Sequence, residues 1–410
     1  MPKHAEIPGL IVKAVESDAE LHLANDLMAK THSPGYFDSL RWFENSGAAY
    51  PGFRREHTRI VLSGGEIAGA LRITTDTIRI GEARLKMGGV AWVSTAPRYR
   101  RRGVATMLMN DALRYMRDHR YHVSMLFGIP DFYHQFGYVT TLAEYSISVD
   151  APEAAASAPG PARKFRAIKP GDIAAIQKIH AANDEEVPCS LLRGAAHFTN
   201  KWDRLKDADV VTDENGKVRA YAHLIRTDDY LKVDECGVAS DAECAGIMDL
   251  CALRAREGYS GRIRFLVPPD HPLARYLRQY TSVHETRVVR ERGGMMAFVH
   301  IGETLENMIP EWEGALMRGP LRESKIEITL LADGAPHRIR ANRGALDIAQ
   351  VAGRNKFGIT ERELVQLLTG YRHVEDILGA RRRLLTSDSR AFLHAVFPKR
   401  DPYVWALDRF

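Results

Sequence analysis

The region around residue 100 constrains the fold of this chain more than any other part of the sequence. The apolar run Val90–Val93 predicts a strand that ends before Pro97. A basic loop, Arg100–Ala105, leads from this strand directly into a predicted helix. One face of that helix is apolar and carries Ala105, Leu108, Met109, Ala112, Leu113 and Met116. A strand, a short loop and an amphipathic helix in this order indicate an α/β unit.

The basic loop lies at a helix N-terminus, where backbone N–H groups are unpaired and the helix dipole is positive. Such a position suits a phosphate or pyrophosphate. Gly103 and Ala105 would let phosphate oxygens approach the amides, and the positive charge of Arg100, Arg101 and Arg102 would complement them. The loop matches neither a Walker loop nor a Gly-x-Gly-x-x-Gly dinucleotide site. The alternative interpretation is a solvated basic turn.

The length of 410 residues predicts two to three domains, and residues 151–164, rich in Ala, Pro, Ser and Gly, predict a linker. Residues 1–150 form the first predicted domain, an α/β unit. Its predicted elements are a helix at 19–29, strands at 59–62, 67–74 and 83–94, and a hairpin turn at Ser63–Glu66.

Residues 165–292 repeat this outline, with a helix near 172–182 and a hairpin tip at Asn215–Gly216, which suggests a duplicated domain. Asp241 and Glu243 stand where the first unit has its basic loop, so only the first unit should bind the cofactor. Residues 293–410 predict an α+β unit. In it, Thr360–Glu363 is a capping box, and Ser387 or Asp388 can cap the last helix.

Composition excludes several other classes. A net charge of +5 is small for this length, and the runs Arg100–Arg102 and Arg381–Arg383 lack interleaved aromatic residues, so nucleic-acid binding is disfavoured. The N-terminus lacks the apolar run of a signal peptide, so we expect a cytoplasmic protein without a membrane span. Four cysteines without a CxxC pair predict reduced core thiols, and no His or Cys pattern predicts a metal site.

The order strand, Pro97, Arg100–Ala105, helix resembles the Arg/Gln-x-x-Gly-x-Gly/Ala signature of the GNAT acetyltransferases. The resemblance implies acetyl-coenzyme A as co-substrate, with its pyrophosphate on this loop. It also implies that backbone groups of Val93 and Thr95 pair with the pantetheine arm and the acetyl group. The predicted cofactor-binding residues are Val93, Ser94, Thr95, Arg100, Arg101, Arg102, Gly103, Val104, Ala105 and Thr106.

The aromatic segment Asp131–Tyr138 resembles the place where GNAT enzymes put a tyrosine near the departing thiolate. The resemblance implies that Tyr133 is the general acid. In the alternative interpretation, the aromatic residues of this segment pack a sheet edge.

Two GNAT-like units followed by an α+β unit resemble the enhanced intracellular survival (Eis) acetyltransferases over the whole chain. This resemblance implies a third domain like a sterol carrier protein, a homohexamer, and amine acceptors such as aminoglycosides or protein lysines. It also implies that the α-carboxylate of the last residue, Phe410, is the general base. The apolar Trp405 and Leu407 predict that this tail docks, in a cleft or against the third domain. Arg409 beside the base disfavours a polycationic acceptor.

The predicted substrate-binding residues are Phe37, Trp42, Trp92 and Asp408. Two hypotheses follow for the function. The first is an N-acetyltransferase in which the acceptor amine attacks the thioester directly, through a tetrahedral intermediate. The second is a non-catalytic lipid-binding or scaffolding protein that retains a relic GNAT domain.

Overall fold

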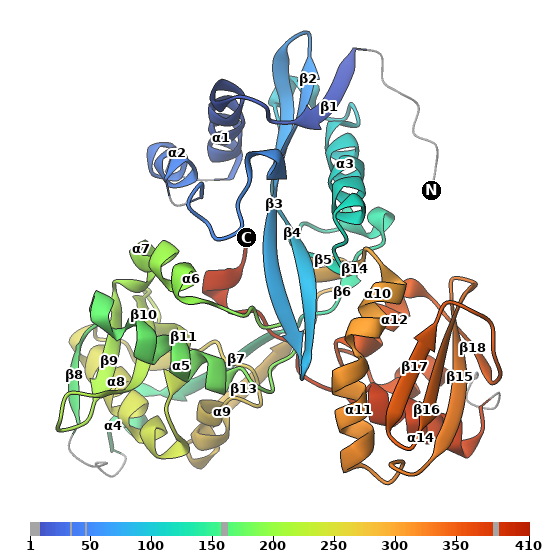
Figure 1. The fold of residues 1–410 in the computed structure, drawn as a ribbon. Coiled ribbons are helices and arrows are strands. Elements are labelled where there is room, and N and C mark those ends of the chain that lie inside the picture. The colour runs from blue at the N-terminus through green and yellow to red at the C-terminus, as the bar shows by residue number, and fades with distance from the viewer. Residues whose placement is uncertain (1–8, 33–34, 46, 157–162, 380–384) are drawn as a thin grey trace.

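A computed structural model describes residues 9–32, 35–45, 47–156, 163–379 and 385–410. The chain forms three units, each built on its own sheet (Figure 1). In Figure 1 the first unit, blue to teal, lies above the second unit, green to yellow, and the third unit, orange to red.

The first unit contains a seven-stranded sheet in the order β1-β2-β3-β4-β5-β14-β6. Its strands are β1 Leu10–Ala14, β2 Thr58–Ser63, β3 Glu66–Ile80, β4 Ala83–Thr95, β5 Val123–Gly128, β6 Val139–Thr140 and β14 Gly293–Phe298. Helices α1 (Asp18–His32) and α2 (Tyr36–Glu44) lie on one side of it and α3 (Val104–Asp118) on the other (Figure 1). The described neighbours pair antiparallel, except β4 and β5, which are parallel.

The second unit contains a sheet in the order β13-β7-β12-β11-β10-β9-β8. Its strands are β7 Glu144–Asp150, β8 Lys164–Ala167, β9 Ala208–Thr212, β10 Val218–Arg226, β11 Leu231–Val238, β12 Arg262–Phe265 and β13 Ser282–Arg287. Its helices are α4 Ala151–Ala156, α5 Ile173–Asn183, α6 Ala195–Asn200, α7 Trp202–Leu205, α8 Cys244–Glu257 and α9 Pro272–Tyr276.

The two sheets have the same strand arrangement, and each includes one strand from outside the predicted bounds of its unit. In both, a parallel pair (β4 with β5, β11 with β12) is followed by an antiparallel strand from elsewhere in the sequence. That strand is β14 in the first sheet and β7 in the second. This shared topology agrees with the duplication predicted from the hairpins.

The third unit is α+β and carries a four-stranded sheet in the order β17-β16-β15-β18. Its strands are β15 Lys325–Ala332, β16 Ala335–Asn342, β17 Ala345–Ala349 and β18 Lys356–Ile359. Its helices are α10 Ile301–Asn307, α11 Ile309–Arg318, α12 Glu361–Leu368, α13 Val374–Leu378 and α14 Ser387–Val396. Trp312 of α11 and Phe392 and Phe397 at α14 are fully buried in its core.

The sheets divide the chain differently from the predicted boundaries. β7 precedes residue 150 but belongs to the second sheet, and β14 follows residue 293 but belongs to the first. Within the predicted linker, residues 151–156 form α4 and Lys164 begins β8, while residues 157–162 lie outside the described residues. The local sequence cannot show this exchange, because pairing partners are selected by tertiary contacts.

Local predictions agree closely with the structure. The turn Ser63–Glu66 joins β2 to β3, and Asn215–Gly216 lies between β9 and β10. The capping box at Thr360 is present, since the Glu363 amide donates to Thr360 Oγ1 at 3.1 Å. The predicted cap of α14 is wrong by one or two residues: Thr386 Oγ1 accepts from the Ser389 amide at 3.1 Å.

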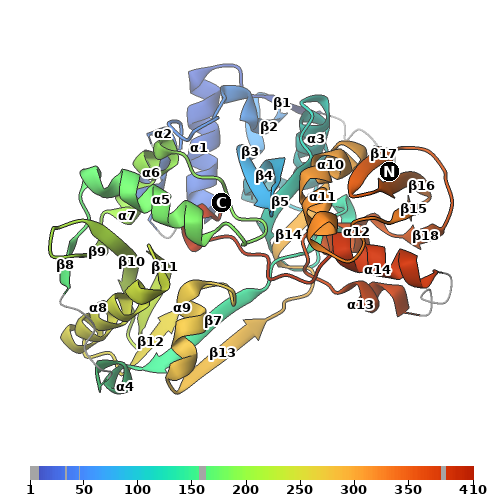
Figure 2. The same ribbon diagram turned by 60° about the horizontal axis from the view of Figure 1, so that its bottom comes forward.

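The C-terminal tail, residues 398–410, crosses from the third unit over the second to the first (Figure 2). The Tyr403 amide donates to the Pro188 carbonyl at 2.9 Å. Trp405 is fully buried in the core of the second unit, and Leu407 packs in a smaller cluster of the same unit. The tail therefore docks as predicted, but on the second unit and not on the third.

Candidate active site

The central feature of the first unit is the point at which β4 and β5 separate, which we call the fork. Their parallel pairing ends at Gly89 and Met125, and beyond this point β4 pairs with β3 while β5 pairs with β14. Next to the fork, β4 has a bulge: Ala91 pairs with Arg72, but Ser94 pairs with Ala70. Trp92 in this bulge has a left-handed φ of 51°. The bulge bends β4 and changes the direction in which its side chains point near the fork.

The basic loop forms a turn that exposes the first amides of α3. Gly103 has a φ of 73° and is the N-cap residue, with no side chain capping the helix. Arg101 also has a positive φ, 60°. Arg100, Arg101 and Arg102 are exposed, and among the described residues none forms an ion pair with a carboxylate. The loop thus combines exposed cations with unpaired helix amides, as an anion site requires.

The remaining predicted cofactor residues lie on either side of this loop. Val93 and Thr95 of β4 are half-buried, and Ser94 is buried with its hydroxyl donating to the Trp92 carbonyl at 2.9 Å. The Val93 carbonyl lies 3.2 Å from His32 Nε2. Val104 is buried under the loop, while Ala105 and Thr106 are half-buried in the first turn of α3.

Tyr133 lies at the other arm of the fork, past the end of β5. A Cβ added to Gly128 would come 2.5 Å from the Tyr133 ring, so the glycine lets the ring lie flat against the strand. Phe132 and Tyr138 contact the same ring edge-on. Burial raises the pKa of Tyr133 to about 12, so its phenol is protonated at neutral pH. The residue therefore both packs the sheet and carries a proton.

The C-terminal residue Phe410 reaches the fork. Its ring lies over Gly89, where an added Cβ would come 2.5 Å from the ring. On the other arm, its ring meets Phe127 edge-on with centroids 5.8 Å apart. The ring of Phe410 thus lies at the point where β4 and β5 separate.

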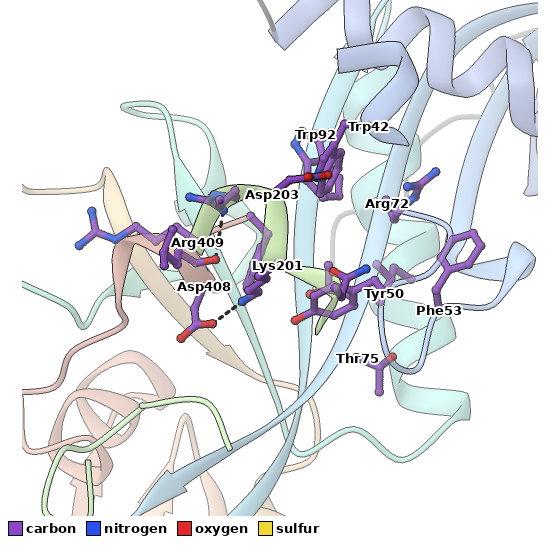
Figure 3. Close-up of a pocket in the computed structure, with 17 residues that line it drawn as sticks. Trp42, Tyr50, Phe53, Arg72, Thr75, Trp92, Lys201, Asp203, Asp408 and Arg409 are labelled. Carbon is purple, nitrogen blue, oxygen red and sulfur yellow. Dashed lines mark hydrogen bonds and ion pairs between the residues drawn. The ribbon is translucent and has the colours of Figure 1, made fainter. Parts of the chain in front are cut away.

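A pocket opens beside Phe410, where the first unit, the second unit and the tail meet (Figure 3). Figure 3 shows residues of the first unit on one side and those of the second unit and the tail on the other. The first unit contributes Trp42, Gly47, Tyr50, Phe53, Arg72, Ile73, Thr74, Thr75 and Trp92. The other side consists of Asn200, Lys201, Asp203, Arg204, Leu407, Asp408, Arg409 and Phe410. We call this the central pocket.

The predicted substrate residues separate into two groups. Trp42 and Trp92 line the central pocket and contact each other with ring centroids 5.2 Å apart. Phe37, in contrast, is 82% exposed on α2 and does not line the pocket. Asp408 borders the pocket, but its carboxylate is held by Arg193 and Lys201. Asp408 thus lies where the prediction expects a substrate-binding residue, but its charge is already compensated by Arg193 and Lys201.

Several pocket residues were missed by sequence reasoning. Arg72 is 2% exposed on β3, and Tyr50 donates a hydrogen bond to Asp76 at 2.8 Å. Lys201 and Arg204 come from the second unit, and Arg204 Nη1 donates to the Leu407 carbonyl at 3.1 Å. These residues belong to no motif and lie far from residue 100 in the sequence. The charged Arg72 inside the apolar strand β3 was the one available signal.

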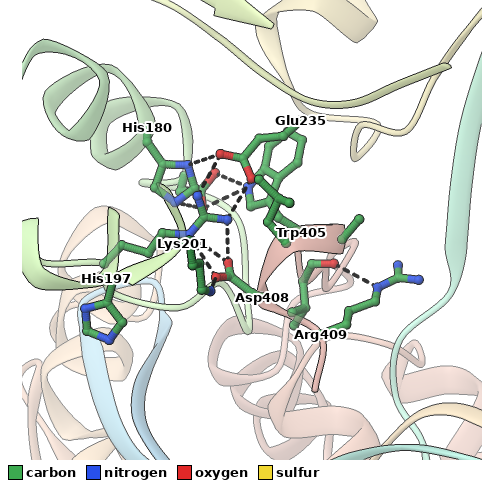
Figure 4. A network of polar contacts seen from close by, with 12 residues as sticks. His180, His197, Lys201, Glu235, Trp405, Asp408 and Arg409 are labelled. Atoms are coloured by element: carbon green, nitrogen blue, oxygen red, sulfur yellow. Dashed lines mark hydrogen bonds and ion pairs between the residues drawn. The ribbon is translucent and has the colours of Figure 1, made fainter. Parts of the chain in front are cut away.

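A buried polar network holds the tail in place (Figure 4). Arg193 binds Asp408 and also Glu235, with Nη1 to Oε1 at 2.7 Å. The Trp405 indole donates to Asp184 at 2.9 Å. Burial opposes ionisation of Asp408, but Arg193 and Lys201 hold its pKa well below the ordinary value. Asp408 is thus a buried, permanently charged anchor two residues before the C-terminus.

The second unit has its own side chains at the position of the basic loop. Arg163 Nη2 donates to the Ala242 carbonyl at 2.8 Å and pairs with Glu243 at 3.3 Å. A Cβ on Gly246 would lie 2.6 Å from the same guanidinium. An internal arginine and an acidic residue therefore occupy the helix end that an anion would need.

The described residues include no group of three or more His, Cys, Asp or Glu side chains placed to hold a metal ion. The four cysteines are buried free thiols. In the described parts of the chain, no helix has the length and apolarity to cross a membrane. The Arg381–Arg383 run lies outside the described residues.

Comparisons with known proteins agree with this geometry. Residues 15–141 match the family model described as "Acetyltransferase (GNAT) domain". No curated protein matches the chain significantly. A GCN5-related N-acetyltransferase from Kribbella flavida is similar in structure over 98% of both chains, with a TM-score of 0.70 and 20% identity. Eis1 from Mycobacterium abscessus is similar over 98% of this chain and all of its own (100%), with a TM-score of 0.65 and 15% identity.

A probable N-acyltransferase from Enterococcus faecalis V583 gives a TM-score of 0.73 at 14% identity, over 98% of this chain and 100% of its own. These structures share the whole three-unit fold with this chain. Residues 15–141 therefore match a GNAT acetyltransferase domain, the domain type of an acyltransferase, and the whole chain has an Eis-like fold.

Proposed function

We propose that the chain transfers the acetyl group of acetyl-coenzyme A to an amine acceptor in the central pocket. The observation that carries the proposal is the position of the C-terminal Phe410, whose ring lies over Gly89 at the fork of β4 and β5. In this proposal the α-carboxylate of Phe410 would lie between the central pocket and the splayed strands. The proposal needs a base at that place, because an ammonium must lose a proton before it can attack a thioester.

The cofactor would lie along the fork, with its pyrophosphate on the loop Arg100–Ala105. The exposed amides at the start of α3, the left-handed Gly103 and the three exposed arginines support this assignment. Val93, Ser94 and Thr95 would face the pantetheine arm, and a backbone amide near Val93 would stabilise the oxyanion. Val104 and Thr106, in the first turn of α3, would support the loop from below the pyrophosphate.

The reaction follows from these positions. The Phe410 carboxylate accepts a proton from the acceptor ammonium, directly or through a water molecule. The free amine then attacks the thioester carbonyl, and the C–S bond breaks as the tetrahedral intermediate collapses. The Tyr133 phenol donates its proton to the departing thiolate, and the second proton that the acceptor nitrogen loses as the amide forms returns the tyrosinate to the phenol. A pKa of about 12 keeps this phenol protonated before each turnover.

Two variants of the C-terminus test the role of the carboxylate. Appending one glycine after Phe410 moves the carboxylate but keeps the ring, whereas Phe410→Ala keeps the carboxylate and removes the ring. We expect the extended chain to lose about 10²-fold or more in kcat with coenzyme A binding unchanged. Full activity of the extended chain on a good acceptor would refute the carboxylate as base.

A binding experiment separates this function from the lipid-binding alternative. Titration calorimetry with coenzyme A and with a fatty acid should give heat for coenzyme A. Coenzyme A should also raise the melting temperature more than the fatty acid does. Stabilisation by the fatty acid alone would refute the proposal. The homohexamer and the sterol-carrier-like third unit stay predictions of the family resemblance, and the cytoplasmic location stays a prediction from the N-terminal sequence.

A further inference from the structure

Arg72 is a buried cation without an anionic partner among the described residues. Its Nη2 donates to Asn25 Oδ1 at 2.6 Å and its Nε to Thr58 Oγ1 at 3.3 Å, and both acceptors are neutral. Its Nη1 is buried and makes no hydrogen bond within the chain. Burial lowers the pKa of Arg72 to about 10, and no neighbouring carboxylate offsets this effect. Burying an unpaired charge is unfavourable, so an anionic partner would stabilise this guanidinium.

This guanidinium borders the central pocket. Arg72 and Gly47 both line the pocket, and a Cβ on Gly47 would lie 3.0 Å from Arg72 Nη1. Because Gly47 has no side chain, no Cβ fills the pocket wall beside the unpaired Arg72 Nη1. The rings of Phe53 and Trp92 lie 4.9 Å and 5.9 Å from the guanidinium carbon, so the cation is held in an aromatic cage.

A second unpaired donor lies on the same face of β3. Thr74 is two residues after Arg72, and side chains two apart on a strand point to the same side. Its Oγ1 is buried without a hydrogen-bond partner, and the residue lines the pocket. Thr74 pairs with Gly89, against which the Phe410 ring lies, so it is the donor nearer to the proposed base. About 7 Å of strand separates the Cα atoms of the two donors.

Apart from the α-carboxylate of Phe410, the pocket charges that no opposite charge compensates are positive: they belong to Arg72, Arg204 and Arg409. Asp408 is used by Arg193 and Lys201, and Asp203 pairs with Lys206 at 3.7 Å. Arg204 and Arg409 donate to backbone carbonyls of Leu407 and Val404, which do not neutralise their charge. A polycationic acceptor would meet repulsion here, whereas an anion would be attracted.

We propose that the acceptor is an amine that also carries a carboxylate, with an apolar or aromatic body, and that Arg72 is the residue that binds this carboxylate. The inference rests on the proposed amine acetylation and assigns its substrate class. The aromatic walls, formed by Trp42, Tyr50, Phe53 and Trp92, would hold the body of the acceptor. The carboxylate at Arg72 would direct the amine along β3 toward Thr74 and Phe410.

Matched acceptors test this selectivity. Para-aminomethylbenzoate carries its amine and carboxylate at opposite ends of one ring, and para-aminomethylbenzamide differs only in the charge. We expect the acid to be acetylated with a kcat/KM about tenfold to a hundredfold above that of the amide. In Arg72→Gln this preference should disappear, and Arg72→Lys should restore part of it. Arg322→Gln, at an exposed pair with Glu323, is the control and should keep the preference.

A binding arm does not depend on acetyl transfer. Para-methylbenzoate and its amide lack the amine, so calorimetry with each probes the carboxylate site alone, and melting curves confirm that the variants fold. Binding of the acid but not the amide, lost in Arg72→Gln, would support the inference even without turnover. If acetylation occurs with equal rates for the acid and the amide, the inference is wrong and the acetyltransferase function stands. If the acid binds but no amine is acetylated, the proposed function fails and the carboxylate site remains.

Discussion

Arg193 and Asp408 form a bidentate ion pair that fastens the last residues of the chain to the second unit. Arg193 Nε lies 2.9 Å from Oδ1 and Nη2 lies 2.8 Å from Oδ2 of Asp408, and both side chains are fully buried. The pair therefore determines where Phe410 lies. It positions this residue at the fork but does not itself contact the fork. Asp408 is a positioning residue in this view.

Asp408→Asn should impair both stability and catalysis. It leaves Arg193 with one carboxylate fewer in a buried site, and breaking such a pair costs about 3–5 kcal/mol. We expect a matching drop in unfolding free energy and a kcat reduced about tenfold or more, with coenzyme A affinity unchanged. Urea unfolding and steady-state kinetics measure the two effects. Glu323→Gln, at an exposed pair with Arg322, should change the unfolding free energy by less than about 1 kcal/mol.

His271 should make the tail sensitive to acid. Burial lowers its pKa to about 3 from an ordinary 6.5, and its ring lies edge-on to Trp405 of the tail. A neutral imidazole stabilises the fold fully above pH 6.5, and this contribution is lost as the pH falls toward the folded value. At pH 5 the loss should be about 2 kcal/mol.

His271→Asn tests this effect, because an asparagine can still accept from the Leu273 amide at the start of α9. The variant should lose less stability between pH 7 and about pH 5 than the parent protein. Thermal unfolding across this range measures it, and His284→Asn at an exposed position serves as control. An identical pH dependence in His271→Asn and the parent would rule out this titration.

Gly103→Ala should weaken cofactor binding beyond its effect on stability. A φ of 73° costs a non-glycine residue about 1–2 kcal/mol, and the added Cβ would stand beside the amides of the loop. We expect coenzyme A to bind about tenfold or more weakly by calorimetry. Gly216→Ala is the matched control, since Gly216 has a φ of 80° in an open turn of the second unit. It should show the stability loss alone.

Gly89→Ala should displace the C-terminus from the fork. The new Cβ would clash with Thr74 Oγ1, the nearest atom, and would come 2.5 Å from the Phe410 ring, which is closer than atoms can approach. Because the ring can move away from β4, we expect activity to fall about tenfold or more while coenzyme A binding persists. Kinetics and calorimetry report these two quantities. Gly302→Ala in α10, where an added Cβ meets nothing within 4 Å, should leave the activity unchanged.

The sequence predicted those features that are specified by residues close together in the chain. The loop Arg100–Ala105, the hairpin turn Ser63–Glu66 and the capping box at Thr360 all appear where the patterns place them. These features are short-range, because a turn, a cap or an amphipathic face is specified within a few residues. The docking of the tail also followed from local composition, since Trp405 and Leu407 are too apolar to remain exposed.

The tertiary structure alone decided how these parts combine. The exchange of β7 and β14 between the sheets, and the pairing of Asp408 with Arg193, join residues that no local pattern connects. The unpaired guanidinium of Arg72 is visible only once Phe53, Trp92 and Gly47 surround it. Burial and charge compensation depend on all the neighbours in space, so these properties arise only when segments that are distant in the sequence pack together.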